Sequence, residues 1–161
     1  MLYWAAGLQP DQRKRDKPFH RTHASGGARF PLEIYPLVLR GPIPKGLYHY
    51  NIKDNVLEQL WQKDFLPEID RYLIDPVQWK NAAIVFFITC VFERNQIKYS
   101  ERGYRYVFID AGHLGQNFYL AAEALGLKCC AVGGFVDQEV NQLIDIDGIH
   151  EAAIYSILVG K

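Results

Sequence analysis

The residue types that could do chemistry are concentrated between Lys98 and Phe135. Lys98 and Tyr99 are adjacent, and the pair Gly133 and Gly134 comes directly after a run of β-type residues. A tyrosine hydroxyl can exchange a proton, a lysine can supply positive charge, and glycines let a ligand approach the backbone because no Cβ blocks it. In this order the residues suggest a site in which backbone amides meet a flat cofactor and side chains handle protons. Each motif taken alone also fits an ordinary surface pair or a tight turn.

The loop from Arg21 to Arg29 is a second candidate, since it combines basic side chains, hydroxyl groups and the run Ser25, Gly26 and Gly27. Backbone N–H donors and guanidinium groups in such a loop can bind phosphate or the polar edge of a heterocycle. It is not a Walker loop, because no Gly-Lys-Ser/Thr sequence follows, and it lacks the glycine pattern of dinucleotide-binding loops. An exposed loop without a ligand is the alternative.

Metal and hydrolase chemistry have less support. His20 and His23 have a His-x-x-His spacing, but no third ligand is nearby in the sequence, so no metal site is predicted. His113 lies within a predicted helix and is more typical of an interface than of a catalytic base. No Ser/His/Asp or Cys/His arrangement is evident.

The cysteines favour a reducing compartment. Cys90, Cys129 and Cys130 are odd in number and lack the spacing of a disulfide framework. We therefore expect buried free thiols and a cytoplasmic protein.

Composition restricts the class of protein further. The 161 residues are 49% hydrophobic, and 18 basic residues balance 18 acidic ones, so bulk charge gives no reason to expect nucleic-acid binding. Basic residues gather in the first 50 positions, where eight Lys or Arg face three acids. Such a region would serve a phosphate-bearing ligand or form a solvated surface. No apolar run approaches the roughly 18 residues of a membrane span, and no signal peptide is evident.

A long helix predicted over residues 104–125 has two usable faces. Residues recurring every three or four positions form one apolar and one polar stripe. The apolar stripe holds Val107, Ala111, Leu114, Phe118, Ala122 and Leu125, and the polar stripe holds Tyr106, Asp110, His113 and Asn117. Polar groups so placed face solvent, line a wet cleft or lie at a dimer seam. Gly126 would end the helix in a left-handed conformation.

The remaining pattern predicts an α+β fold. The continuous apolar run 82–92 predicts a central strand, and the runs 47–52 and 56–61 around a polar link predict a hairpin. Further strands are expected at 33–39, 127–132 and 152–159, helices at 1–8, 65–73 and 137–144, and a short helix or turn at 77–80; most of 10–30 reads as loop. Several strands precede the long helix, so the elements do not alternate as in a doubly wound sheet.

Five segments, in order, resemble the SagB-type dehydrogenase branch of the FMN-dependent nitroreductase family. They are residues 21–35, the Gly-Leu-Tyr-His-Tyr sequence at 46–50, residues 98–106, residues 110–117 with 132–135, and the closing strand at 158–160. The resemblance implies an antiparallel sheet flanked by helices, in an intertwined homodimer with an FMN at each of two sites built from both subunits. The implied cofactor contacts are Gly133 and Gly134 beside the flavin N5, Ser25, Gly26 and Gly27 of the partner subunit at the pyrimidine edge, and Arg21 and Lys161 near the ribityl chain or phosphate.

The resemblance also implies that Lys98 and Tyr99 are catalytic. Tyr99 would take or relay a proton while hydride passes to the flavin N5, and Lys98 would assist electrostatically. The substrate would be a small molecule or a peptide, as in azoline dehydrogenation or the reduction of nitro- or quinone-type acceptors.

One departure from the family pattern leaves two functions open. Family members usually begin with an Arg-x-Ser-x-Arg segment that grips the FMN phosphate, whereas this chain starts within the following helix and has no tail after Lys161. We expect residues 1–161 to form a single nitroreductase-like domain lacking that segment, in which other basic residues hold the phosphate or FMN binds weakly. The two candidate functions are an FMN-dependent oxidoreductase and a catalytically silent dimer that acts as a binding or scaffold subunit.

Overall fold

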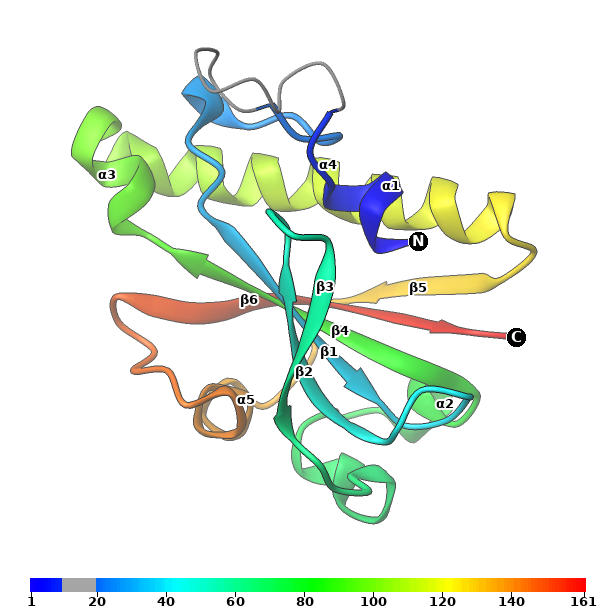
Figure 1. The fold of residues 1–161 in the computed structure, drawn as a ribbon. Coiled ribbons are helices and arrows are strands. Elements are labelled where there is room, and N and C mark those ends of the chain that lie inside the picture. The colour runs from blue at the N-terminus through cyan, green and yellow to red at the C-terminus, as the bar shows by residue number, and fades with distance from the viewer. Residues whose placement is uncertain (10–19) are drawn as a thin grey trace.

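The computed structural model describes residues 1–9 and 20–161. Within these residues the chain forms an antiparallel six-stranded sheet in the order β3-β2-β1-β4-β6-β5 (Figure 1). The strands are β1 (Leu32–Val38), β2 (Gly46–Asn51), β3 (Val56–Trp61), β4 (Ala82–Val91), β5 (Lys128–Val132) and β6 (Glu151–Gly160). This arrangement confirms the predicted α+β fold with a central antiparallel sheet.

The strand β4 lies at the centre because both of its faces are covered. Val85 and Phe87 pack into the core on one face of the sheet, whereas Phe86 and Ile88 pack into the core on the other. A strand buried on both faces needs apolar residues at successive positions rather than at alternate ones. This explains the continuous apolar run in the sequence and confirms the predicted central strand.

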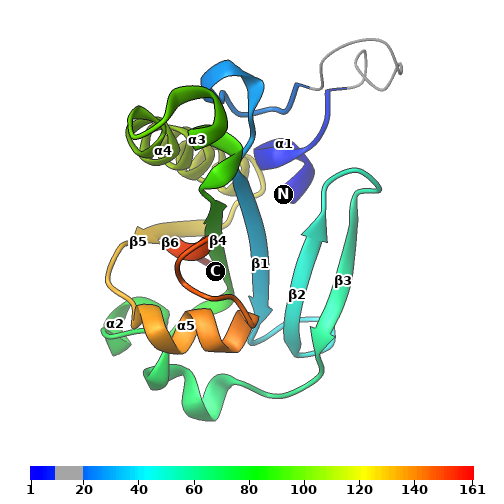
Figure 2. The same cartoon turned by 90° about the vertical axis from the view of Figure 1, so that its left-hand side faces the viewer.

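Helices cover the two faces separately (Figure 2). One face packs against α1 (Leu2–Ala6) and the long helix α4 (Arg102–Ala124), with α3 (Glu93–Tyr99) beside the start of α4. The opposite face packs against the 3-10 turn η3 (Leu66–Arg71), α2 (Pro76–Trp79) and α5 (Asp137–Ile144). The loop before β1 contains a shorter 3-10 turn, η2 (Gly26–Ala28), which contacts α4.

Four expectations require correction. The helix predicted at 65–73 is only the 3-10 turn η3, with a proline near its start. The helix α3 has no apolar stripe, buries only Asn95 and was not predicted. Leu125, assigned to the buried stripe of α4, lies beyond the helix end and is 55% exposed. Only Cys90 is a buried thiol: Cys130 is exposed and Cys129 half-buried, because β5 is an edge strand.

The other predicted elements are confirmed, and none of their bounds differs from the observed one by more than two residues. The part of the loop prediction that falls on residues 10–19 lies outside the described residues. None of the helices in the described part of the chain is long and apolar enough to cross a membrane.

Candidate functional site

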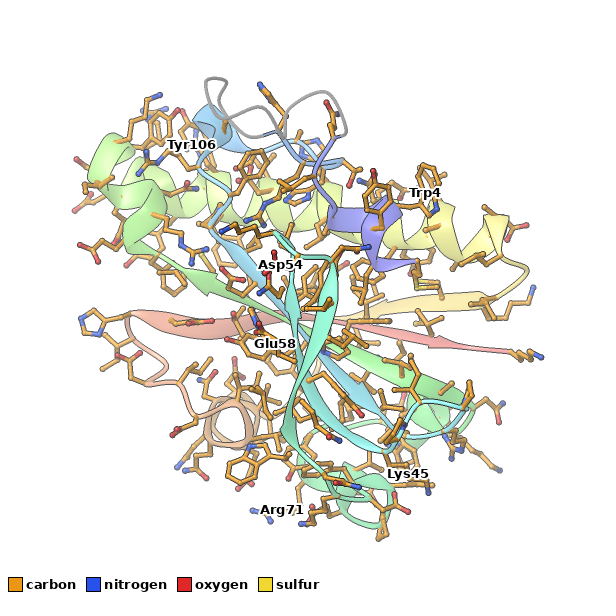
Figure 3. The ribbon with its side chains drawn as sticks, viewed as in Figure 1. Trp4, Lys45, Asp54, Glu58, Arg71 and Tyr106 are labelled. Atoms are coloured by element: carbon orange, nitrogen blue, oxygen red, sulfur yellow. The ribbon has the colours of Figure 1, made fainter. Side chains whose placement is uncertain are left out.

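Lys98 and Tyr99 occupy the last turn of α3, next to the corner where the chain turns into α4. The Tyr99 ring packs edge-on against Tyr106 of α4, with ring centroids 4.7 Å apart and planes at 82°; Figure 3 labels Tyr106. Lys98 Nζ lies 5.3 Å from the Tyr99 ring centroid. The pair is therefore held by the packing of two helices, which restricts the orientation of the tyrosine ring.

The glycines of the loop before β1 approach this pair closely. A Cβ added at Gly27 would overlap the Tyr99 hydroxyl and lie 3.0 Å from Lys98 Nζ. Gly27 also has a φ of +62°, which favours glycine. At Gly26 an added Cβ would lie 3.2 Å from the Tyr106 Cβ. The structure thus brings the predicted loop and the predicted catalytic pair together, although they are some 70 residues apart in the sequence.

Asp110 of α4 holds the loop in place. Its Oδ2 accepts a hydrogen bond of 2.6 Å from the Ser25 hydroxyl, and its Oδ1 accepts one of 3.0 Å from the Gly26 N–H. The Ser25 hydroxyl oxygen in turn accepts a 2.9 Å bond from the Phe30 N–H. Burial raises the pKa of Asp110, and the two bonds that it accepts oppose this rise. The carboxylate therefore fixes the loop against α4.

Unfavourable backbone conformations gather at the same place. Of the five non-glycine residues with positive φ in the described chain, Ala28, Phe30 and Ser100 flank the Gly27–Tyr99 contact. Phe30, with a φ of +47°, is an outlier for a bulky residue. Such conformations persist only where surrounding contacts enforce them, and they cluster at functional sites.

Arg21 and His23 pack around Phe30. The Arg21 guanidinium lies 5.0 Å from the Phe30 ring centroid, and its Nη1 donates a 3.3 Å bond to the Leu32 carbonyl. His23 is buried edge-on against the same ring, and within the described part of the chain neither of its ring nitrogens has a hydrogen-bond partner. Burial lowers the pKa of His23 to about 4, with Arg21 and His113 adding to the effect. Both residues thus help to enforce the loop conformation.

Gly133 and Gly134 lie apart from this cluster, in the connection from β5 to α5. Both are exposed, and a Cβ added at either would meet nothing within 4 Å. The next residue, Phe135, enters the core on the face opposite α4 and forms a bridge with Leu73. Within one protomer the structure therefore places the two predicted halves of the cofactor site in different regions.

Lys161 lies at the other end of β5 from these glycines. Lys128 pairs with Gly160, whereas Val132 pairs with Ser156. The spacing of strand residues puts Lys161 and Gly133 about 20 Å apart. Lys161 lines an apolar groove of about 880 Å³, together with Arg40 and Lys80.

Sequence reasoning did not single out Asp110 and Tyr106 as site residues, although the polar stripe of the long helix contained them. The stripe lies under the loop: Tyr106 and Asp110 contact Gly26, and Asn117 Nδ2 donates to the carbonyls of Ala5 and Thr22 at 3.1 and 3.2 Å. In residues 1–9 and 20–161, no group of three or more His, Cys, Asp or Glu is placed to hold a metal ion.

Comparison with known proteins finds related sequences and a solved structure with the same fold. The protein MJ1384 of Methanocaldococcus jannaschii, named as a nitroreductase, is 33% identical over 133 residues, covering 81% of this chain and 67% of that protein. The trifolitoxin-processing protein TfxB of Rhizobium leguminosarum bv. trifolii is 31% identical over 85% of this chain, which spans only 38% of TfxB. A crystal structure from Anabaena variabilis, also named as a nitroreductase, superposes with a TM-score of 0.84 at 27% identity, over 98% of this chain and 33% of that one.

The family model described as the nitroreductase family matches residues 11–161. This match covers nearly the whole chain and agrees with the fold and with the relatives. The chain belongs to the nitroreductase family.

Proposed function

We propose that this chain is an FMN-dependent oxidoreductase of the SagB-type branch, acting on a peptide azoline or on a nitro- or quinone-type acceptor. The observation that carries the proposal is the packing of Gly27 against Lys98 and Tyr99 in a member of the nitroreductase family. The similarity to TfxB, named for trifolitoxin processing, favours a peptide substrate. We also propose that residues 1–161 form one nitroreductase-like domain.

The residues present fit a flavin. Gly133 and Gly134 offer exposed backbone with open space where side chains would otherwise stand. Arg21 and Lys161 offer positive charge for the ribityl chain or phosphate. The Ser25 hydroxyl and the Gly26 N–H are already bonded to Asp110, so flavin contacts from these two groups would share or replace those bonds.

The protein residues would position the reactants and handle the proton. When bound, FMN would supply the hydride chemistry at its N5. The Tyr99 phenolate oxygen would take the proton that leaves the substrate, which returns the side chain to the neutral phenol, and the nearby Lys98 ammonium would stabilise the phenolate before the transfer. Gly27 covers one side of the tyrosine hydroxyl, which limits access of water from that side.

A homodimer would complete the site, because one protomer keeps the Gly133–Gly134 turn apart from the Ser25–Gly27 loop. The outer face of α4 supports this proposal, since several large side chains on it remain exposed in the protomer. The exposed side chains are Tyr104, Phe108, Ile109, Tyr119 and Leu120. Exposed apolar side chains gathered on one helix face mark a protein–protein interface.

Flavin binding tests the cofactor. Purified protein is expected to show flavin absorbance, or to acquire it on titration with FMN, with a protein-dependent quenching of flavin fluorescence. Protein that neither quenches flavin fluorescence nor retains colour after excess FMN is removed would refute the oxidoreductase proposal. The catalytically silent dimer would then be the remaining candidate.

Replacing Tyr99 tests the proton step. Tyr99→Phe is expected to keep FMN affinity and to slow oxidation of an azoline-containing peptide about 100-fold, in line with the loss of a positioned acid or base. Tyr48→Phe is the matched control, because the Tyr48 hydroxyl in β2 bonds to the Pro44 carbonyl and to Gln59 Nε2 and belongs to no proposed site. Equal turnover by the Tyr99 variant and this control would remove Tyr99 from the mechanism.

A further inference from the structure

Cationic side chains from three parts of the chain converge on one cavity of about 540 Å³, here called the basic cavity. Arg21 and Arg29 come from the segment before β1, Lys53 from the β2–β3 turn and Arg94 from α3. The label of Asp54 in Figure 3 marks the turn that carries Lys53. The other described lining residues are Glu33, Leu8, Ala28, Phe30 and Ile52.

The charge in this lining is unbalanced, with four cations against one carboxylate. The charge of Glu33 is already compensated, because Arg94 Nη1 bonds to its Oε1 and His49 Nε2 lies 3.2 Å from its Oε2. Although burial opposes ionisation of Glu33, these two partners hold its pKa below the ordinary value, so it is ionised at neutral pH. Positive charge therefore remains uncompensated in the cavity.

Arg21 is a partly buried cation, whose loss of hydration a bound anion would offset. Burial lowers the pKa of Arg21; Glu33 opposes that effect, and the like charge of Arg94 adds to it. A half-buried guanidinium beside a second guanidinium is stabilised by an added anion.

Two of the cations, Arg29 and Lys53, have donors available to a ligand, and Arg29 is also oriented by the protein. Arg29 Nε donates a 2.7 Å bond to the Arg94 carbonyl, which fixes the plane of the guanidinium. Among the described residues, neither the Arg29 Nη atoms nor Lys53 Nζ has a hydrogen-bond or ion-pair partner. The neighbouring Asp54 carboxylate accepts from Asn51 Nδ2 at 3.3 Å and does not line the cavity.

We propose that the basic cavity binds a phosphate-class oxyanion. Guanidinium forks match the paired oxygens of a phosphate, and three of them with one ammonium can engage several oxygens at once. The apolar side chains of Phe30 and Ile52 would pack against the remainder of the ligand. The lining residues Ala28 and Arg29 directly follow Gly27, the residue that packs against Tyr99. The site does not depend on the proposed redox activity.

Calorimetric titration of the flavin-free chain with inorganic phosphate and with pyrophosphate tests the proposal, with ionic strength held constant by sodium chloride. We expect saturable binding of both anions, with pyrophosphate tighter. The variant Arg29→Gln/Lys53→Gln removes two exposed cations and should weaken binding about tenfold or more, since each makes a charge-assisted contact. Absence of saturable phosphate binding by the unaltered chain would overturn the proposal.

The matched control is Arg71→Gln/Lys63→Gln, which removes the same two residue types from exposed ion pairs with Glu139 and Glu68 near η3. It should change phosphate affinity less than about twofold, because neither residue lines the basic cavity and the loss of exposed ion pairs costs little stability. Equal weakening by both double variants would show a general charge effect and overturn the site. Succinate binding as tight as phosphate would overturn the phosphate class.

Competition separates two sources of the phosphate. If inorganic phosphate displaces FMN, and Arg29→Gln/Lys53→Gln weakens FMN but not riboflavin, the oxyanion is the phosphate of the flavin. If phosphate and FMN bind together, the cavity serves a separate phosphate-bearing ligand. Both outcomes support the oxyanion site. A chain that binds phosphate but no flavin would also support this site, whereas the proposed oxidoreductase function would be refuted.

Discussion

Gly27 is the position where backbone conformation and available space restrict the residue type most severely. Its φ of +62° favours glycine, and the Tyr99 hydroxyl occupies the space that a side chain would need. Gly27→Ala is therefore expected to displace Tyr99 and Lys98, to lower flavin affinity, and to destabilise the fold by more than the ~1–2 kcal/mol that a left-handed alanine costs. Flavin titration and urea unfolding measure the two effects.

Gly126 provides the control for this prediction. It has nearly the same φ, +66°, but an added Cβ would meet nothing within 4 Å. Gly126→Ala should cost only the backbone term and leave flavin affinity unchanged. If the two alanine variants behave alike, the contact between Gly27 and Tyr99 has no part in forming the site.

His23 should make stability depend on pH. The folded state holds its pKa at about 4 because the ring is buried next to Arg21 and faces His113, whereas the unfolded value is near 6.5. Between these values the unfolded state binds more protons, so stability falls as pH drops from 6.5 to 4, by about 3 kcal/mol. Urea unfolding at pH 7 and pH 4.5 should show this loss in the wild type and a smaller loss in His23→Leu. His20→Leu, at an exposed position, should keep the wild-type pH dependence; an unchanged dependence in His23→Leu would exclude His23 as the cause.

At the scale of elements, α4 has three distinct faces. Its apolar stripe packs on the sheet through residues such as Val107 and Phe118. Its polar stripe anchors the Ser25–Gly27 loop and α1, through Asp110 and Asn117 respectively. Its third face exposes apolar side chains to solvent in the protomer. One helix thus connects the core, the candidate site and the proposed dimer interface.

Asp110→Ala should loosen the loop without removing α4. The change leaves the Ser25 hydroxyl and the Gly26 N–H without their acceptor, which costs about 2–4 kcal/mol. Asp110→Asn should cost less than Asp110→Ala, because the amide keeps one acceptor oxygen for the two donors whereas alanine keeps none. Hydrogen exchange at residues 25–30, read together with flavin affinity, measures the effect.

Asn117→Ala is the companion variant, because it loosens Thr22 and Ala5 but not Ser25. It should leave exchange at residues 25–30 close to that of the wild type. If the amides of residues 25–30 stay protected from exchange in Asp110→Ala, then contacts other than Asp110 position the loop.

At the scale of the whole molecule, the outer face of α4 predicts self-association. Phe108 is 58% exposed in the protomer and belongs to this face. Phe108→Glu would place a charge in an apolar interface, so we expect at least about a tenfold shift from dimer toward monomer and a loss of flavin affinity. Sedimentation velocity over a range of protein concentrations measures the shift.

Ile149→Glu is the control for self-association, since Ile149 is 75% exposed in the loop before β6 and far in sequence from α4. It should leave the sedimentation profile unchanged. A wild-type protein that sediments as a monomer at all concentrations would remove the proposed two-subunit site.

Much of the fold was predictable from the sequence because local periodicity reports burial. The run 82–92 is apolar at every position because β4 is covered on both faces, and the stripes of α4 follow from a helical period of 3.6 residues. The helix α3 was missed because its only buried residue is the polar Asn95, so it has no apolar stripe to read.

The candidate site was predictable only as separate motifs. The sequence by itself determined that a Lys-Tyr pair, a Ser-Gly-Gly loop and a Gly-Gly turn exist and which kinds of element carry them. The tertiary structure decided that Gly27 touches Tyr99, that Asp110 holds the loop, that Gly133 lies elsewhere in the protomer, and that four cations share one cavity. These contacts join residues far apart along the chain, and they depend on the simultaneous packing of several elements, which no local pattern encodes.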